Sequence, residues 1–274
     1  MRKYKIKIYI NMHKNIKIPT EIQYYYPIQV GAYGKEKFLS LTDDTGDNIS
    51  SKNDRYCELT SMYWIWKNDF DSDYIGICHY RRYYDFFDQG MKRKFVREYS
   101  YQWENIFPHS AINKINCADI IPDLLKKHDI ILLEKSKIKP NLEKQYGKYH
   151  DANDLQILHD VLIYKHPEYK KTWDIVMHKN RMSIGNMFIA KNVIFKDYAA
   201  WLFDILFEVE KYIPPKEDTY QNRTFGFMSE WLLNIYVFHH QYSVQYLPLI
   251  FLGDRDHIVK LNIGEYIKKI IGSY

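Results

Sequence analysis

The residues best suited to chemistry gather in one stretch, His79-Tyr80-Arg81-Arg82, which follows directly on the apolar run of residues 74–78. A short apolar run of this kind is typical of a strand that is buried on both faces, as in a parallel sheet. Ligands of open α/β sheets bind just beyond the carboxyl ends of the strands. Arginine suits phosphate because its planar guanidinium makes paired, charge-assisted hydrogen bonds. The stretch therefore predicts a cationic site for an anionic ligand, with a solvated basic turn as the alternative.

Two further candidate sites lie nearer the N-terminus. Asp43 and Asp44 stand within residues 41–50, whose Asp, Asn and Gly content favours a turn. Adjacent carboxylates can also ligate a hard cation through oxygen, but the spacing does not match an EF-hand loop, so we favour an ordered turn beside the ligand. His13 follows a strand-like pattern at residues 5–10 and is a candidate base or ribose contact, although a lone loop histidine is more often structural.

Three polar residues belong to later elements. Asp151 precedes the apolar positions of an amphipathic helix and suits its N-cap. Asn186 stands inside residues 183–190, an otherwise apolar segment that we interpret as a strand, so a buried amide there needs partners. Glu230 follows Ser229 at the expected opening of a helix, where a carboxylate interacts favourably with the helix dipole.

The elements that must position these residues alternate along the chain. Strand-like patterns occur at residues 5–10, 74–78, 129–134 and 243–251, and helix-like patterns at 53–68, 155–162 and 195–209. This alternation predicts an α/β fold with a mostly parallel central sheet. We interpret residues 1–274 as a single domain, residues 85–119 as a lid or acceptor-side insertion, and residues 263–271 as a basic amphipathic helix that packs on the domain or on a membrane surface.

Composition excludes several classes of protein. The net charge of +5 over 274 residues is a mild bias, below that of a dedicated nucleic-acid binder, and suits a phosphorylated substrate or an anionic membrane surface. Three widely spaced cysteines form neither a disulfide framework nor a zinc pattern and fit a reducing compartment. There is no signal-peptide pattern and no apolar run near the ~20 residues of a membrane span. We expect a cytoplasmic protein.

Six groups of residues are characteristic in combination: Ile28-Gln-Val-Gly31; Leu41-Thr-Asp-Asp-Thr-Gly-Asp-Asn-Ile49; Cys57-Glu-Leu-Thr60 with Tyr63-Trp-Ile-Trp-Lys-Asn68; Tyr74-Ile-Gly with His79-Tyr-Arg-Arg-Tyr83; Gly185-Asn-Met-Phe-Ile189; and Phe225-Gly-Phe with Ser229-Glu230. Together they resemble a bacterial family of domains of unknown function that is associated with capsular or exopolysaccharide glycosyltransferases. The resemblance covers nearly the whole chain. It implies a glycosyltransferase-A-like fold with a Rossmann-like, mostly parallel sheet flanked by helices.

In that fold a central strand ends in Asp-x-Asp, which binds a divalent metal on the donor diphosphate. This chain has His79-Tyr80-Arg81 in that place. Fixed cations can meet the charge on a leaving diphosphate as a metal ion would. We therefore assign no metal site, and leave dependence on Mn²⁺ or Mg²⁺ open.

The resemblance implies a nucleotide-sugar-dependent hexosyltransferase. It moves a sugar, of the galactose type, from a UDP-linked donor to a hydroxyl of a lipid-linked or polysaccharide acceptor in capsule, exopolysaccharide or O-antigen synthesis, with peripheral contact at the inner face of the membrane. The implied roles are donor diphosphate binding by His79, Arg81 and Arg82, nucleotide binding by His13, Asp43 and Asp44, donor sugar binding by Asn186, and acceptor deprotonation by Glu230 or, as second choice, Asp151.

Two alternatives come from other classes. Interleaved Tyr and Arg side chains could stack on bases and pair with phosphates in a protein that binds single-stranded nucleic acid, although the modest net charge argues against it and we expect no nucleic-acid partner. A glycan-binding module without catalytic activity is the other alternative. It would bind saccharide but would not hydrolyse a nucleotide sugar.

Overall fold

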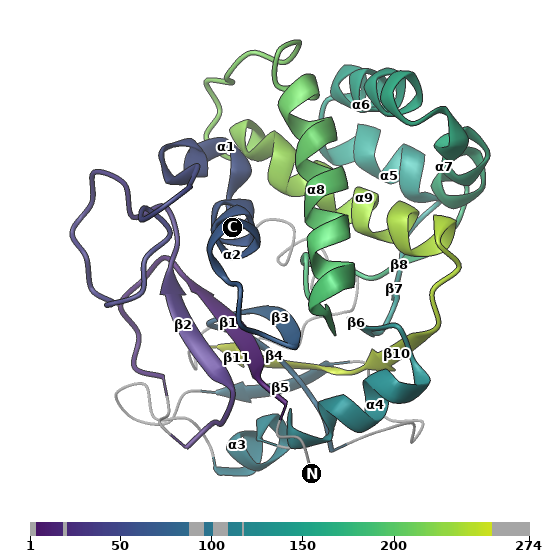
Figure 1. Cartoon of the computed structure of the whole chain (residues 1–274). Coiled ribbons are helices and arrows are strands. Elements are labelled where there is room, and N and C mark those ends of the chain that lie inside the picture. Colours follow the sequence, from purple (N-terminus) through teal and green to yellow (C-terminus); the bar gives the residue numbers. More distant parts are fainter. Residues whose placement is uncertain (1–3, 19–20, 88–95, 101–108, 117, 254–274) are drawn as a thin grey trace.

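A computed structural model describes residues 4–18, 21–87, 96–100, 109–116 and 118–253 (Figure 1). The strands in this part of the chain are β1 (Ile6–Met12), β2 (Tyr25–Gln29), β3 (Tyr74–His79), β4 (Arg82–Tyr84), β5 (Val96–Ser100), β6 (Ile130–Leu133), β7 (Ser136–Lys137), β8 (Arg181–Met182), β9 (Phe188–Lys191), β10 (Val244–Leu247) and β11 (Leu249–Gly253).

The helices alternate with these strands. They are α1 (Asn53–Tyr56), α2 (Leu59–Asn68), α3 (His109–Ile115), α4 (Ile121–Lys127), α5 (Leu142–Tyr149), α6 (Ala152–Lys165), α7 (Lys170–Met177), α8 (Asn192–Val209) and α9 (Thr224–His239), with 3-10 turns η1 (Ser50–Lys52), η2 (Ala118–Ile120), η3 (Pro167–Tyr169) and η4 (Gln221–Arg223). No helix within the described residues is long and apolar enough to cross a membrane.

One mixed sheet organises the molecule. Its strands follow the order β10-β6-β9-β3-β4-β11-β5, with β1 paired to β3 and β2 paired to β1. The pairs β1–β2, β1–β3, β6–β10 and β5–β11 are parallel, and the pairs that involve β4 or β9 are antiparallel. Within the described residues, every strand of this sheet except β4 and β9 therefore runs in one direction. This confirms the predicted α/β fold with its mostly parallel sheet.

Strand β3 lies at the centre of the sheet, and all six of its residues are buried. Gly76 in β3 permits its neighbours to close over it. A Cβ atom at this position would lie only 2.8 Å from Ile189 Cγ1 and 3.2 Å from Ile8 Cγ1. The glycine is therefore required by packing against β1 and β9, and the strand that carries His79 at its end is held rigidly from both sides.

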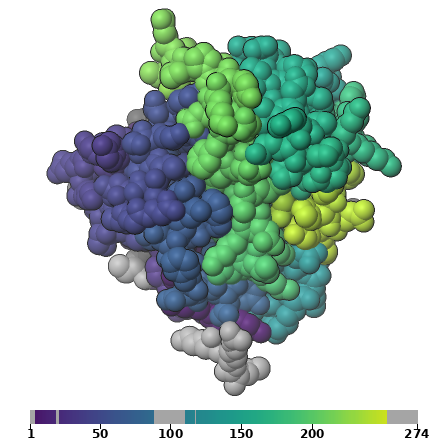
Figure 2. Space-filling model, turned by 45° about the horizontal axis from the view of Figure 1, so that its top comes forward, coloured from purple at the N-terminus to yellow at the C-terminus, as the bar shows by residue number. Residues whose placement is uncertain are grey.

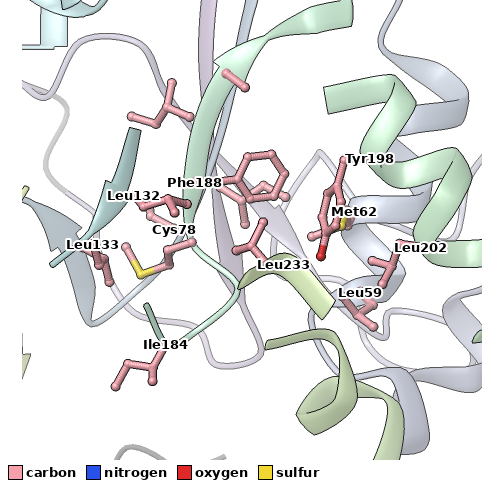
Figure 3. Close-up of a cluster of buried hydrophobic side chains, with 14 of the residues drawn as sticks. Leu59, Met62, Cys78, Leu132, Leu133, Ile184, Phe188, Tyr198, Leu202 and Leu233 are labelled. Atoms are coloured by element: carbon pink, nitrogen blue, oxygen red, sulfur yellow. The ribbon is translucent and has the colours of Figure 1, made fainter. Parts of the chain in front are cut away.

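Helices cover both faces of the sheet. In Figure 1, α2, α8 and α9 lie over one face, and α3 and α4 lie on the other. The space-filling view shows α8 (green) between the N-terminal part of the chain (purple to blue) and helices α5–α7 (teal) (Figure 2). Strand and helix side chains interlock in the core between them, among them Cys78, Leu132 and Phe188 from strands and Leu59, Met62, Tyr198, Leu202 and Leu233 from helices (Figure 3).

The structure corrects three predicted elements. The helix expected over residues 53–68 is two helices, because Cys57 adopts a left-handed φ of 51° between them. The strand expected over residues 183–190 is mostly a turn, because Gly185 (φ +89°) and Asn186 (φ +49°) both leave the extended region. Helix α9 begins at Thr224, not near Ser229. Each correction concerns a residue that shapes the site described below.

The two predicted accessory segments are only partly described. Residues 85–119 include β5, α3 and the start of η2, and α3 packs near β4. The role of this segment as a lid or acceptor-side insertion stays a prediction. The amphipathic helix predicted at residues 263–271 lies outside the described residues.

Candidate active site

A cavity of about 480 Å³ opens where β1, β2 and β3 reach their carboxyl ends. This is the position at which open α/β sheets bind ligands. Its volume lies within the range of roughly 300–1,000 Å³ that is usual for small-molecule sites. The described residues that line it are Asn11, His13, Val30, Lys35, Asn53, Asp54, Cys57, Glu58, His79, Tyr80, Arg81, Arg82, Lys216, Thr219, Asn222, Arg223 and Phe251.

Positive charge dominates the wall of this cavity. Five of its described lining residues are Lys or Arg and two are Asp or Glu. Arg81 and Arg82 are placed by the tight turn that joins β3 to β4, and Arg223 stands at the N-cap of α9. Lys216 forms an ion pair with Asp154, whose Oδ2 lies 2.5 Å from the ammonium nitrogen. An anion entering this cavity would meet charges that are already fixed in position.

The side chain of His79 is neutral and hydrogen-bonds to the backbone of Gly185. This differs from the expectation of a third cation beside Arg81 and Arg82. Its Nε2 lies 2.8 Å from the carbonyl oxygen of Gly185, so Nε2 carries the proton and donates. Burial, together with the nearby charge of Arg82, lowers the pKa of His79 to about 3. His79 lines the cavity, and its contact with the donor diphosphate stays a prediction.

The turn at Gly185–Asn186 connects β3 with a buried acid. Asn186 Nδ2 donates to Glu58 Oε1 over 2.6 Å and to the carbonyl oxygen of Gly226 over 3.1 Å. Its Nδ2 group is therefore satisfied by protein groups, whereas its buried Oδ1 has no hydrogen-bond partner within the described part of the chain. Asn186 is not among the described residues that line the cavity. The structure places it behind Glu58. Its predicted role toward the donor sugar is not tested by this arrangement.

Glu58 lies in the break between α1 and α2, and it reaches the cavity. It is only 5% exposed, and burial raises its pKa. The break is locked by Asn53, whose Nδ2 donates to Cys57 O over 2.7 Å and to Thr60 Oγ1 over 3.1 Å. Sequence reasoning missed Glu58 because the apolar spacing of residues 53–68 favours one continuous helix.

Glu230 is buried in the second turn of α9, so its predicted place at the helix opening is wrong. The backbone N–H of Gly185 lies near enough to its carboxylate to lower the pKa of Glu230. Burial, and after it the negative charge of Glu58, raises the pKa of Glu230 to about 7, while Arg82 acts in the opposite direction. The two acids therefore interact electrostatically across the Gly185–Asn186 turn.

The predicted turn at residues 41–50 is confirmed, and its two aspartates have different surroundings. Asp43 is fully buried and accepts hydrogen bonds from the N–H groups of Gly31 and Ala32 and from two hydroxyls. Asp44 accepts from Thr42 and pairs with Lys37 over 2.9 Å. Neither is among the described lining residues, so Asp43 shapes the loop that follows β2. Contact of either with the nucleotide stays a prediction.

His13 is among the described residues that line the site, and Asp151 is not. His13 follows β1, lines the cavity and packs edge-on against Tyr80 at 4.9 Å between ring centres. Desolvation of the ring, with nearby cations, lowers its pKa to about 4, although the residue as a whole is exposed. Asp151 caps α6 by accepting from the backbone N–H of Asn153, as its position predicted. Its Oδ2 lies 3.6 Å from the ammonium nitrogen of Lys216, which lines the cavity.

The described residues contain no dedicated group of metal ligands. Within this part of the chain, no three His, Cys, Asp or Glu side chains gather closely enough to hold an ion. The turn after β3 and the start of β4 carry Arg81 and Arg82, where the resemblance to glycosyltransferase-A folds implies carboxylates. Metal dependence of any reaction stays a prediction to be tested.

Three cationic residues were also missed from the sequence. Lys35, Lys216 and Arg223 line the cavity, yet they lie far along the chain from the His79-Tyr80-Arg81 stretch. No local pattern distinguishes such residues from solvated surface charges, since their position depends on the tertiary fold. The Phe225-Gly-Phe segment, which starts two residues after Arg223, was one available signal.

Comparison with known proteins finds a glycosyltransferase of similar fold. A solved structure of WbbM, described as a bifunctional glycosyltransferase in its apo state, superposes with a TM-score of 0.82 and 30% sequence identity. The match covers 90% of this chain and 45% of the WbbM chain, so this chain spans less than half the length of that protein. No curated protein matches the chain. Residues 7–241 match the family described as "Domain of unknown function (DUF4422)", and the chain belongs to this family.

Proposed function

We propose that the protein is a glycosyltransferase that transfers a hexosyl group from a nucleotide diphosphate donor to a hydroxyl of a growing glycan. The observation that carries this proposal is the cavity at the carboxyl ends of β1–β3, with five Lys or Arg side chains on its wall. The similarity of fold to WbbM supports it. A UDP-linked, galactose-type donor and a lipid-linked or polysaccharide acceptor of capsule, exopolysaccharide or O-antigen synthesis are the finer terms of the proposal, with the reaction at the inner face of the membrane.

The charges on the cavity wall fit the chemistry of the leaving group. When the bond between the sugar and the diphosphate breaks, negative charge increases on the diphosphate oxygens. Guanidinium groups fixed in a partly dry cavity stabilise that charge without reorganising. Arg81, Arg82 and Arg223 are in place for this role. The acceptor hydroxyl must lose its proton during transfer, and the carboxylates among the described lining residues, those of Asp54 and Glu58, are the candidates to accept it.

The test is binding of UDP to wild type and to Arg81→Ala and Arg82→Ala, measured by calorimetry. Loss of one hydrogen bond to a charged group costs roughly 1.5–3 kcal/mol, so Kd should rise about 10- to 150-fold. Lys126→Ala is the control, because Lys126 is exposed on α4, forms an exposed ion pair with Asp123 one helical turn earlier, and does not line the cavity. Its Kd should equal that of wild type.

Unchanged UDP affinity in both folded arginine variants would show that the cavity does not bind the diphosphate. Tight binding of an oligonucleotide with steep salt dependence, and none of UDP, would favour the nucleic-acid alternative. Saccharide binding without release of UDP from any UDP-sugar would favour a glycan-binding module.

A further inference from the structure

Two buried carboxylates, those of Glu58 and Glu230, lie against the same turn at the base of the cavity. Asn186 Nδ2 donates to Glu58 over 2.6 Å, and the nearby backbone N–H of Gly185 lowers the pKa of Glu230. Each glutamate is only 5% exposed. Two consecutive residues of one turn therefore bring together two acids that come from distant parts of the chain, the α1–α2 break and helix α9.

The turn that holds them is itself fixed on several sides. His79 Nε2 donates to the carbonyl oxygen of Gly185 over 2.8 Å, and Asn186 also donates to Gly226 O in α9. Both turn residues have a positive φ, which only glycine and, less readily, asparagine adopt without strain. Backbone strain of this kind persists where surrounding contacts hold it and is concentrated at functional sites.

The two acids differ in what they can reach. Glu58 lines the cavity, whereas Glu230 is not among the described residues that do so. A carboxylate has about four lone-pair positions for hydrogen bonds, and Asn186 occupies one of those on Glu58. Glu58 can therefore accept a hydrogen bond from a ligand hydroxyl in the cavity, while Glu230 lies behind it.

Burial and the charges around the pair limit it to at most about one negative charge at pH values below the pKa of Glu230, which is about 7. Burial and the charge of Glu58 raise the pKa of Glu230, and burial raises the pKa of Glu58. Arg82 from β4 and Arg223 from η4 favour the charged forms, and neutral His79 from β3 contributes no charge. Two like charges that are held close together in a partly dry site share a proton in this way.

We propose that Glu58 is the catalytic base of the transfer reaction and that Glu230 is its positioning partner, with the two acting as one carboxylate pair. This assignment rests on the proposed function. The acceptor O–H proton passes to a Glu58 oxygen while the acceptor oxygen bonds to the anomeric carbon. The bond from that carbon to the diphosphate breaks, and its electron pair leaves with the nucleoside diphosphate. Glu230 keeps the pair at a single negative charge and so sets the pH at which Glu58 can accept a proton.

The test compares Glu58→Gln, Glu230→Gln and the exposed control Glu143→Gln. UDP release is followed with whichever of UDP-galactose, UDP-glucose and UDP-N-acetylglucosamine the wild type turns over fastest. Glu58→Gln keeps an oxygen for Asn186 but cannot take a proton, so turnover should fall about 10²–10⁴-fold while Kd for UDP stays unchanged. Glu230→Gln should lose less activity. It should also remove the inflection of the pH profile near pH 7, because Glu230 no longer adds a second negative charge beside Glu58 as the pH rises through its pKa of about 7.

Turnover of Glu58→Gln within about threefold of wild type, with the loss confined to Glu230→Gln, would overturn the assignment. If Glu58→Gln does not fold, Glu58→Asp serves instead, since it keeps the charge but withdraws the carboxylate from the cavity. Full activity in Glu58→Asp with an unaltered pH profile would also contradict a base at this position. A wild type that neither binds UDP nor releases it would overturn the proposed function and this assignment together, whereas an active wild type isolates the question of the base.

Discussion

Replacement of Asp43 by asparagine tests whether the loops around the cavity depend on one buried carboxylate. Asp43 Oδ2 accepts from Gly31 N at 2.8 Å and from Thr60 Oγ1 at 2.5 Å. Its Oδ1 accepts from Ala32 N at 3.0 Å and from Ser50 Oγ at 2.5 Å. The residue has no exposed surface. Four donors and no acceptor therefore surround the side chain, and they belong to the loop after β2, to η1 and to α2.

The expected loss of stability follows from this arrangement. In either orientation, the amide of Asp43→Asn directs an NH₂ group at one backbone N–H and one hydroxyl. The hydroxyl can rotate and accept, but the backbone N–H cannot, and an unsatisfied buried donor costs about 1–3 kcal/mol. The remaining hydrogen bonds also lose their charge assistance. We expect the free energy of unfolding to fall by about 2–4 kcal/mol.

Urea denaturation followed by circular dichroism measures this change, and Asp44→Asn is the matched control. Asp44 pairs with Lys37, which is half exposed, and such a pair contributes about 0–1 kcal/mol. Equal stability of Asp43→Asn and wild type would refute the reasoning. If Asp43→Asn instead keeps its stability and loses affinity for UDP, Asp43 contacts the nucleotide, as the family resemblance of the sequence implied.

Two further predictions concern pH and metal ions. Because the pKa of Glu230 is raised to about 7 in the folded protein from an ordinary value of 4.5, wild type should lose stability as pH rises through that interval. Urea denaturation should therefore show Glu230→Gln gaining on wild type between pH 4.5 and 7, and a constant difference would contradict the raised pKa. Because arginines occupy the end of β3, UDP release should persist after exhaustive chelation with EDTA; complete loss that Mn²⁺ or Mg²⁺ restores would reveal a metal site involving Asp54, Glu58 or the donor itself.

The elements with a clear hydrophobic period were predictable, and the breaks between them were not. Residues 74–78 are apolar without interruption, so a buried central strand was the only arrangement that satisfied them. The break at Cys57 depends on a hydrogen bond from Asn53 and on the close approach of Gly226, whose added Cβ would lie 3.1 Å from Cys57 Sγ. The first is a local side-chain contact and the second is a tertiary contact of the α1–α2 break with α9, and apolar spacing contains no information about either.

The same distinction applies to the site. Arg81 and Arg82 could be placed because they follow a recognisable strand, and the carboxyl end of such a strand faces ligands. Glu58 could not be placed, because its position depends on the break between α1 and α2 at Cys57. Asp151 illustrates the opposite case, since its side chain caps α6 as the local sequence alone predicted.

Binding and chemistry in this cavity depend on different kinds of charge. Guanidinium groups keep their charge at any physiological pH, and His79 stays neutral because its pKa is lowered to about 3. The attraction for a diphosphate therefore does not vary through these groups between pH 6 and 8. The Glu58–Glu230 pair changes its charge within that interval, since the pKa of Glu230 is raised to about 7. In the proposed reaction, proton transfer would therefore respond to pH through the buried acids, while binding of the donor by the arginines would not.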